Sequence, residues 1–326
     1  MSWRHETIIQ DRPAMLWEPA GDDDGSSVSR VVDLESACTQ IVPSWNIVAP
    51  RGGGFAVLLR VRRQDGVWSG WRVMGLWGTA RVPATPAADA WPEVAVDTLR
   101  SDRPLVAAQY ALLSSPDSAE PARVDRFALC CTALAEDDGP STAARLPLRP
   151  VRLEVPFRSQ FSDASGVGSR LCSPTCVAMV LSYYAAAPPF GEIAAACYDP
   201  RHDLFGNWSR AVQAAFGFGV RGYVTRFHDL EEAWGVLRSG RPIVASIAFT
   251  DGALPGAPLG HTDGHLVVVC GVTTDGDLLV NDPAAPPGAG TRVYPGEPFA
   301  AAWFGHRGTA YVFDPPAAGP IACAPP

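Results

Sequence analysis

The sequence predicts an α+β domain preceded by an all-β, sandwich-like domain, and three observations support this. The chain has 326 residues and is 47% hydrophobic, which is enough for two cores at about 100–200 residues per domain. Its first half alternates short β-branched and aromatic runs with glycine and proline clusters. In its second half, helical patterns come first and strand patterns follow, as in α+β proteins. We place the domains at residues 1–145 and 146–326.

The first half contains runs typical of strands and no amphipathic helix of useful length. Asp65-Gly66 separates the first two runs and is a strong signal for a β-hairpin. A β-sandwich accommodates such strands economically. The polar and then proline-rich segment 135–156 predicts a linker. The predicted strands are 54–64, 67–77, 108–115 and 124–134.

The second half contains the helical patterns, and their ends carry recognisable caps. Pro174 suits the first turn of a helix, where its missing N–H costs nothing. Asp229 fits an N-cap, Glu232 the capping-box position and Gly240 a helix stop. The predicted helices are 173–184, 191–199, 207–217 and 229–240. The predicted strands are 221–227, 241–249, 265–272, 277–282, 291–294 and 309–313.

The charge balance excludes several classes of function. The net charge is −8, whereas nucleic-acid binding depends on clustered positive charge, so no nucleic-acid partner is expected. All 26 basic residues are arginine. Without lysine, a Schiff base, a phosphate-loop lysine and a lysine general base are excluded.

The start of the chain and its cysteines bear on the compartment. No run reaches the roughly 18–20 apolar residues of a membrane span. Glu6, Asp11 and Arg12 occupy the place of a signal peptide's apolar core. We therefore expect a cytoplasmic protein, or a secreted one if the start is truncated. The eight cysteines are irregularly spaced, which does not indicate a disulfide framework.

Cys172 has the position of a reactive thiol. It directly precedes the predicted helix at 173–184, and the free N–H groups and dipole of a helix N-terminus stabilise a thiolate. Cys176 instead shares one apolar face with Met179, Val180 and Tyr183, at helical spacing. The pattern therefore predicts Cys172 as a nucleophile and Cys176 as a core residue.

A thiolate nucleophile needs a base, and the base needs a group that orients it. His265 opens the apolar run HLVVVCGV, and a turn at 273–276 leads into DLLVND. The first residue of one hairpin strand lies near the last residue of the other, so His265 and Asp282 are predicted neighbours. Gln160, twelve residues before Cys172, has an amide that is able to donate to an oxyanion beside the Cys172 N–H.

The segments VPFRSQ, LCSPTCVAMVLSYY, GNW and GHLVVVCGVTTDGDLLVNDPAAP resemble stand-alone bacterial relatives of cysteine peptidase family thirty-nine. The best-known members of that papain-like family cut leader peptides after a double glycine. The resemblance covers about residues 151–314. It implies Gln160 as oxyanion donor, Cys172 as nucleophile, His265 as base and Asp282 as orienting group, with a peptide or protein as substrate. The first half is similar to the β-rich region ahead of this domain in actinobacterial members.

Two features depart from the family pattern. Ser173 stands where family members usually have glycine after the nucleophile, and a larger residue there could crowd the substrate backbone. No transporter segment is attached, which argues against a role in leader-peptide export. Trp208 of the GNW motif is expected to wall the cleft and contact substrate, and the segment 250–264 is expected to overhang the site.

Two alternatives remain at this point. Cys172, Cys176, His261 and His265 are a donor set that tetrahedral zinc accepts, but glycines and strand residues break the helical spacing of the histidines. We therefore expect no metal or cofactor. A catalytically silent domain that binds a peptide or glycan is the other alternative. Seven of the ten tryptophans lie in the first half: Trp3, Trp17, Trp45, Trp68, Trp71, Trp77 and Trp91. No sequence feature indicates an oligomeric state.

Overall fold

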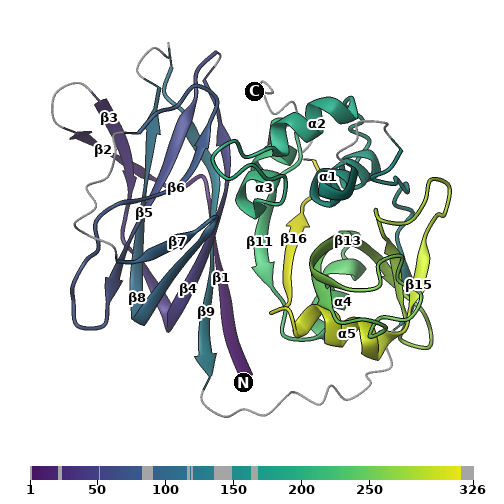
Figure 1. Cartoon of the computed structure of the whole chain (residues 1–326). Coiled ribbons are helices and arrows are strands. Elements are labelled where there is room, and N and C mark those ends of the chain that lie inside the picture. Colours follow the sequence, from purple (N-terminus) through teal and green to yellow (C-terminus); the bar gives the residue numbers. More distant parts are fainter. Residues whose placement is uncertain are drawn as a thin grey trace.

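The computed structural model describes residues 2–20, 24–50, 52–82, 91–115, 118, 120–135, 149–162 and 168–316. The expected domain boundary at 145/146, most of the linker 135–156, and Cys323 lie outside these residues. Figure 1 shows a strand-rich part formed by the first half of the chain beside a part in which helices cover a smaller sheet. We call them the N-terminal part (2–135) and the C-terminal part (149–316).

The N-terminal part consists of strands, because every regular element described up to residue 135 is a strand. They are β1 (Ser2–Asp11), β2 (Met15–Ala20), β3 (Asp24–Ser29), β4 (Val32–Val48), β5 (Phe55–Arg63), β6 (Arg72–Trp77), β7 (Glu93–Ala95), β8 (Thr98–Ser114) and β9 (Arg123–Ala135). Antiparallel pairing gives the order β1-β9-β4-β8-β3-β2, with β5 joining β8 to β6 and β7 pairing with β8. The predicted all-β character is confirmed.

The long strands β4 and β8 hold this part together. The first half of β4 pairs with β8 and its second half with β9, across bulges that bend the strand. Phe127 stacks with both Trp45 and Tyr110, and all three rings are buried in the core of this part. The pairing joins all nine strands into a single sheet, so it does not separate the two sheets of a sandwich. The predicted hairpin forms at Gly66, whose φ is +87° and whose N–H donates to Arg63.

In the C-terminal part three α-helices precede most of the strands, as predicted, but an additional helix at Gly296–Phe304 lies between the last two strands. Its helices are η1 (Gly168–Arg170), α1 (Cys172–Tyr183), α2 (Phe190–Cys197), α3 (Trp208–Gly217), α4 (Leu230–Arg238) and α5 (Gly296–Phe304). Its strands are β10 (Val151–Arg152), β11 (Gly222–Arg226), β12 (Ile243–Phe249), β13 (Thr262–Val272), β14 (Leu278–Asn281), β15 (Arg292–Tyr294) and β16 (Thr309–Phe313). The sheet order is β11-β16-β12-β13-β14-β15, with β10 against β13. Helix α1 packs on β13, which brings its N-terminus toward that strand.

The two parts share an interface along the edge strand β11. The side chains of Asn46 and Ser44 accept hydrogen bonds from the backbone N–H groups of Gly222 and Val224, at 3.0 and 2.9 Å. Gln213 of α3 both donates to and accepts from the backbone of β4, at 2.8 Å each. An uncovered strand edge is open to pairing with other chains. The N-terminal part therefore satisfies the edge of the C-terminal sheet, and one apolar cluster continues through both parts.

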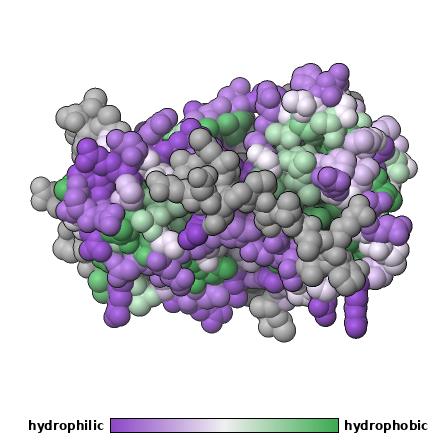
Figure 2. All heavy atoms as spheres, turned by 90° about the horizontal axis from the view of Figure 1, so that it is seen from below, coloured by the Kyte–Doolittle hydropathy of each residue, from purple (hydrophilic) through white to green (hydrophobic). Residues whose placement is uncertain are grey.

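The surface seen in Figure 2 is largely hydrophilic, with apolar residues in separate patches. Large exposed apolar side chains are scattered through the described residues: Ile9, Leu16, Val31, Val67, Phe161 and Val293. None of the helices in the described ranges combines the length and the apolar character that crossing a bilayer requires.

Candidate active site

Cys172 is the first residue of α1 and differs from the other cysteines in its exposure. Of the seven cysteines that the structure describes, six are buried and only Cys172 is partly exposed. The N-cap residue, Leu171, makes no side-chain hydrogen bond to this helix end. The N–H groups of its first turn are therefore left to interact with the sulfur or with a substrate.

His265 and Asp282 meet across the hairpin formed by β13 and β14. The turn closes through a hydrogen bond from the N–H of Thr273 to the carbonyl of Asp277, at 2.8 Å. The Nε2 atom of His265 lies 2.8 Å from Oδ1 of Asp282, and both side chains are buried. The neighbours predicted from the hairpin pattern therefore do meet. Because Asp282 engages Nε2, the ring nitrogen left to interact with Cys172 is Nδ1.

The electrostatics favour a charged pair between sulfur and imidazole. Burial alone raises the pKa of Cys172, but a hydrogen bond and the charge of His265 oppose it, so the pKa is lowered overall. Burial lowers the pKa of His265, yet hydrogen bonds with Asp282 and Cys172 raise it to about 9. At neutral pH the site therefore favours a thiolate beside an imidazolium.

Asp282 is held by groups other than His265. The Tyr294 hydroxyl donates to Oδ2 of Asp282 at 2.6 Å, and the backbone N–H of Ala284 donates to Oδ1 at 2.8 Å. Burial raises the pKa of Asp282, but the hydrogen bonds and charge of His265, with the Tyr294 bond, lower it overall. The carboxylate stays charged and fixed in orientation. Tyr294 is a site residue that sequence reasoning missed, because it lies on another strand and carries no local signal.

We expect Tyr294→Phe to lower both stability and activity. The change leaves a buried carboxylate oxygen without its donor, at a cost of about 1–3 kcal/mol in unfolding free energy. The loosened Asp282 is expected to reduce kcat/KM about tenfold, a loss of about 1.4 kcal/mol. Urea unfolding and steady-state kinetics measure the two effects. The matched control is Tyr183→Phe, which removes a hydroxyl that donates to Gly240 at 3.1 Å and should leave kcat/KM unchanged. Equal activity of Tyr294→Phe and wild type would contradict the positioning role.

Gln160 is placed by the same turn that carries Asp282. Its N–H donates to the carbonyl of Pro283 at 2.8 Å, and the Ser159 hydroxyl donates to that of Ala285 at 2.6 Å. The Gln160 side chain is buried, and its Oε1 has no hydrogen-bond partner among the described residues. A buried amide oxygen without a hydrogen-bond partner is unusual unless a donor on a ligand completes it. The turn thus fixes the orienting carboxylate and the segment of Gln160 together.

Ser173 and Cys176 lie away from the solvent-exposed side of the Cys172 sulfur. Ser173 is fully buried, and its Oγ lies 3.2 Å from the Tyr311 hydroxyl. The Ser173 side chain therefore occupies the core and not the space above Cys172. Cys176 is also buried, donates to the carbonyl of Leu266 at 3.2 Å, and has a pKa raised by burial. Its predicted core role is confirmed.

The alternative zinc set does not assemble in the described residues. No group of three possible ligands within metal-binding distance includes Cys172, Cys176, His261 or His265. His261 is exposed in the loop before β13. The segment 250–261 is a loop, and its Leu254 packs into an apolar cluster of the C-terminal part. The expectation that the segment overhangs the site stays a prediction.

Trp208 lies at the start of α3, beside the N-terminal part. Asn207 caps this helix as predicted, accepting from the N–H of Arg210 at 3.0 Å. The backbone N–H of Trp208 donates to the carboxylate of Asp97, which follows β7, at 2.6 Å. Trp208 is not among the residues that line the pocket described next. Its contact with substrate therefore stays a prediction.

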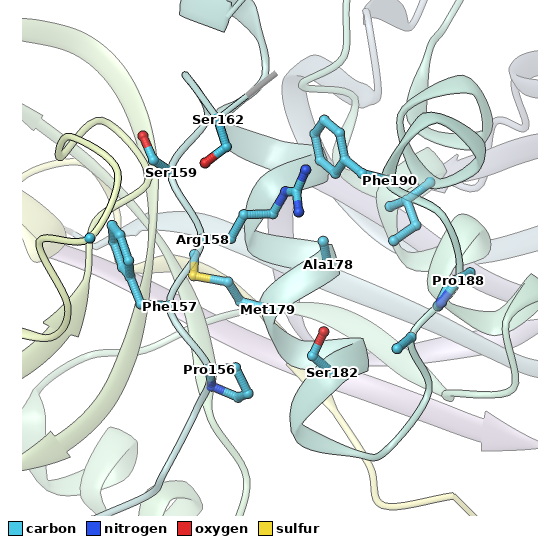
Figure 3. Close-up of a pocket in the computed structure, with 13 residues that line it drawn as sticks. Pro156, Phe157, Arg158, Ser159, Ser162, Ala178, Met179, Ser182, Pro188 and Phe190 are labelled. Atoms are coloured by element: carbon cyan, nitrogen blue, oxygen red, sulfur yellow. The ribbon is translucent and has the colours of Figure 1, made fainter. Parts of the chain in front are cut away.

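A pocket of about 340 Å³ opens between the segment of Gln160 and helices α1 and α2 (Figure 3). Phe157, Met179 and Phe190 supply apolar walls, and the Arg158 guanidinium lies 4.3 Å from the ring centroid of Phe190. Ser159 and Ser162, on either side of Gln160 along the chain, also line the pocket. The pocket therefore extends from the neighbourhood of Gln160 along the flank of α1.

The tryptophans of the N-terminal part contact the protein itself. Trp45 and Trp77 are buried. The guanidinium of Arg60 lies 5.1 and 4.6 Å from the ring centroids of Trp68 and Trp71. A ring stacked by arginine offers less surface to a sugar. These contacts favour a structural role for the described tryptophans.

Comparisons with protein-family models match both parts of the chain. Residues 152–311 match the model of the Peptidase_C39 like family, and residues 18–131 match the model of the Peptidase C39 N-terminal domain. No curated protein matches the chain significantly.

Solved structures give weak overall similarity. A crystal structure of a double glycine motif protease from an AMS/PCAT transporter, in complex with its leader peptide, is 23% identical. The match covers 51% of this chain and 97% of that chain, with a TM-score of 0.36. A structure of the infectious bursal disease virus Gx strain is 12% identical, covering 40% of this chain and 32% of that chain, with a TM-score of 0.26. The two family matches follow one another along most of the chain: residues 152–311 belong to the Peptidase_C39 like family, and residues 18–131 ahead of them match the Peptidase C39 N-terminal domain.

Proposed function

We propose that this protein is a papain-like cysteine peptidase that hydrolyses a peptide or isopeptide amide bond. The observation that carries the proposal is the pair formed by Cys172 and His265. Among the cysteines that the structure describes, the one partly exposed thiol has a lowered pKa, and the imidazole hydrogen-bonded to it has a pKa raised to about 9. A thiolate at a helix N-terminus beside an imidazolium is an activated nucleophile with its acid already in place.

The first half of the proposed reaction forms a thioester. The Cys172 thiolate attacks the amide carbon, and the carbonyl oxygen becomes an oxyanion. The side-chain N–H of Gln160 and the backbone N–H of Cys172 donate to that oxygen. The Nδ1 proton of His265 passes to the leaving nitrogen as the C–N bond breaks, which releases the amine product.

The second half regenerates the enzyme. His265, now neutral, takes a proton from water, and the hydroxide attacks the thioester carbon. The C–S bond breaks, the acid product leaves, and Cys172 returns as a thiolate beside the imidazolium. Asp282 keeps the ring oriented and stabilises its charge in both halves without changing its own protonation.

The pocket beside α1 suits a substrate side chain away from the cleaved bond. Ala178 and Ser182 line it and lie about 9 and 15 Å along the helix from Cys172, at about 1.5 Å per residue. An extended peptide advances about 3.3 Å per residue, so the pocket is reached about three to five residues from the scissile amide. Its apolar walls favour an apolar side chain there.

Gln160→Ala tests the catalytic proposal. We expect kcat to fall about 10²- to 10³-fold with little change in KM, because the lost donor acts on the oxyanion and not on the bound substrate. Cleavage sites are first identified by mass spectrometry on a peptide library, and one cleaved peptide then serves for kinetics. Iodoacetamide should alkylate Cys172 at the wild-type rate in this variant.

The control for this experiment is Gln64→Ala, which truncates an exposed glutamine in the N-terminal part. It should leave kcat and KM unchanged. The proposal fails if the wild-type protein cleaves no peptide in the library, and the oxyanion role fails if Gln160→Ala retains wild-type kcat.

A further inference from the structure

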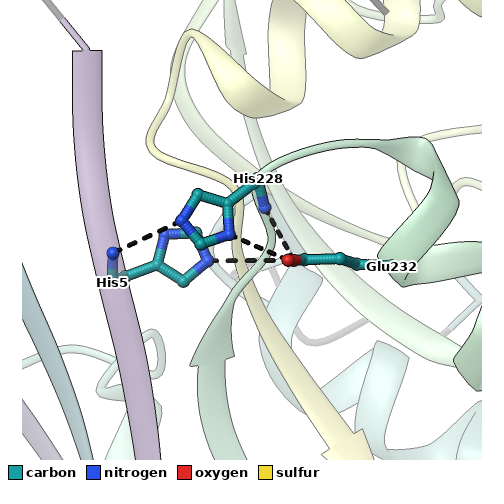
Figure 4. Close-up of side chains that lie close together, drawn as sticks. All are labelled: His5, His228 and Glu232. Carbon is teal, nitrogen blue, oxygen red and sulfur yellow. Dashed lines mark hydrogen bonds and ion pairs between the residues drawn. The ribbon is translucent and has the colours of Figure 1, made fainter. Parts of the chain in front are cut away.

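Three possible metal ligands meet where the N-terminal and C-terminal parts touch (Figure 4). His5 lies on β1, His228 follows β11, and Glu232 lies in the first turn of α4. Each offers one ligand atom, and the three atoms lie within 4.8 Å of one another. No other group of three histidine, cysteine or acidic side chains in the described residues lies so close.

The cap of α4 brings His228 and Glu232 together. Asp229 accepts from the N–H groups of Glu231 and Glu232, at 2.9 and 3.0 Å, which starts the helix. Glu232 reaches back past the cap, so that Oε2 accepts from the His228 N–H and Oε1 lies 2.9 Å from the His228 Nδ1. One carboxylate and one imidazole nitrogen are therefore already adjacent.

His5 supplies the third ligand with its free lone pair. Its side chain is 7% exposed, and Nε2 is buried without a hydrogen-bond partner, 4.0 Å from Oε2 of Glu232. The ring also bonds to the backbone of Arg226, and since Nε2 has no partner this bond uses Nδ1. Histidines that bind metals commonly donate their second N–H to a backbone carbonyl, which fixes the tautomer. A buried polar atom without a partner is rare and calls for a ligand.

We propose that His5, His228 and Glu232 bind a divalent transition-metal ion of the zinc type. Two imidazole nitrogens and a carboxylate suit zinc, with water completing the coordination. The ring centroids of His5 and His228 lie 3.5 Å apart, with an angle of 14° between the ring planes. Because the nitrogen lone pairs lie in these nearly parallel planes, one ring must tilt before both lone pairs can point at the same ion. The His228 side chain is 39% exposed and has room to do so. The ion displaces the proton between Nδ1 of His228 and Glu232. The neutral ring then carries its proton on Nε2, so the 3.4 Å contact in which that atom accepts from the His5 N–H opens as the ring tilts.

The ion would connect the two parts of the chain. One ligand belongs to the first strand of the N-terminal part and two to the C-terminal part, 223 residues further along. The complete ligand set exists only in the folded protein, so binding stabilises the folded state by mass action. The site uses none of the residues of the proposed catalytic mechanism, and the inference stands apart from that function.

The test measures zinc binding to tag-free Cys172→Ala protein, in which the reactive thiol no longer competes for metal. After dialysis against zinc, elemental analysis should find one equivalent per chain. His5→Gln and Glu232→Gln, each in the same background, should lose it. The matched control is His202→Gln, because His202 pairs with Asp199 at 2.9 Å without a third ligand. That variant should keep the equivalent.

Two further measurements keep the proposal falsifiable. Cobalt should give a visible absorption band with the Cys172→Ala protein and none with Glu232→Gln, in which the altered side chain is half-exposed and is not part of the core. Zinc should raise the Tm of the Cys172→Ala protein and not of the two ligand variants. Absence of bound zinc, or retention of it in His5→Gln and Glu232→Gln, overturns the proposal and leaves a hydrogen-bonded interface cluster.

Discussion

Cys172→Ala is expected to reduce peptide hydrolysis by about 10⁴- to 10⁶-fold, the range found when a covalent nucleophile is removed. No other described cysteine is partly exposed, so none is placed to replace it. The variant should also lose rapid alkylation by iodoacetamide at neutral pH. Peptide mapping of the alkylated wild-type protein identifies the modified residue, and steady-state kinetics measures the loss of turnover.

Cys176→Ala is the matched control, because it removes the same group one helical turn further into the core. It should keep both alkylation and turnover while unfolding free energy falls by about 1–3 kcal/mol, as for a small core truncation. The two variants thus separate reactivity from packing. The assignment of the nucleophile is wrong if Cys176 reacts faster than Cys172 with iodoacetamide.

His265→Ala is expected to have a comparably large effect on turnover and a distinct effect on pH dependence. With the imidazole removed, only the backbone hydrogen bonds of Leu266 and Ser173 still oppose burial, and the pKa of Cys172 rises. Each unit of that rise lowers the thiolate fraction tenfold, so alkylation at pH 7 should slow at least about tenfold. Alkylation rates measured from pH 5 to 10 should move to the alkaline side in the variant.

The pH dependence of turnover in the wild-type protein follows from Cys172 and His265. The lowered pKa of Cys172 keeps the thiolate present at neutral pH, and the thiolate is lost as the pH falls through that value. The raised pKa of His265 keeps the imidazolium until the pH rises through about 9. Turnover that needs both should therefore give a bell-shaped profile with its alkaline limb near pH 9. His261→Ala, which truncates an exposed histidine four residues earlier, should leave the profile unchanged. A wild-type profile in His265→Ala contradicts the ion pair.

The local signals of the sequence predicted the elements that carry the candidate site. The predicted helix at 173–184 starts within one residue of the observed start of α1 at Cys172. The turn at 273–276 predicted the contact of His265 with Asp282, because hairpin geometry depends only on a short stretch of chain. Asp229 and Gly240 likewise mark the two ends of α4, because aspartate suits an N-cap and glycine suits the positive φ after the helix.

Elements without such signals were missed. Strand β4 carries Pro43 and several polar residues, and it is held by pairing with both β8 and β9. Helix α5 begins at Gly296 and lacks a polar face over most of its length, so no clear amphipathic period marks it. Its Phe299 and Trp303 are fully buried among other segments. In both cases packing against distant chain overrides weak local preference.

The sequence by itself determined the two-part organisation, the helix starts and the hairpin that pairs the base with its carboxylate. Only the tertiary structure decided that Tyr294 holds Asp282, that the turn at Pro283 anchors Gln160, and that His5 meets His228 and Glu232. The physical reason is the range of the interactions. Caps, turns and periodicity depend on neighbours a few residues away, whereas these contacts arise when sheets and helices far apart in the chain pack against one another.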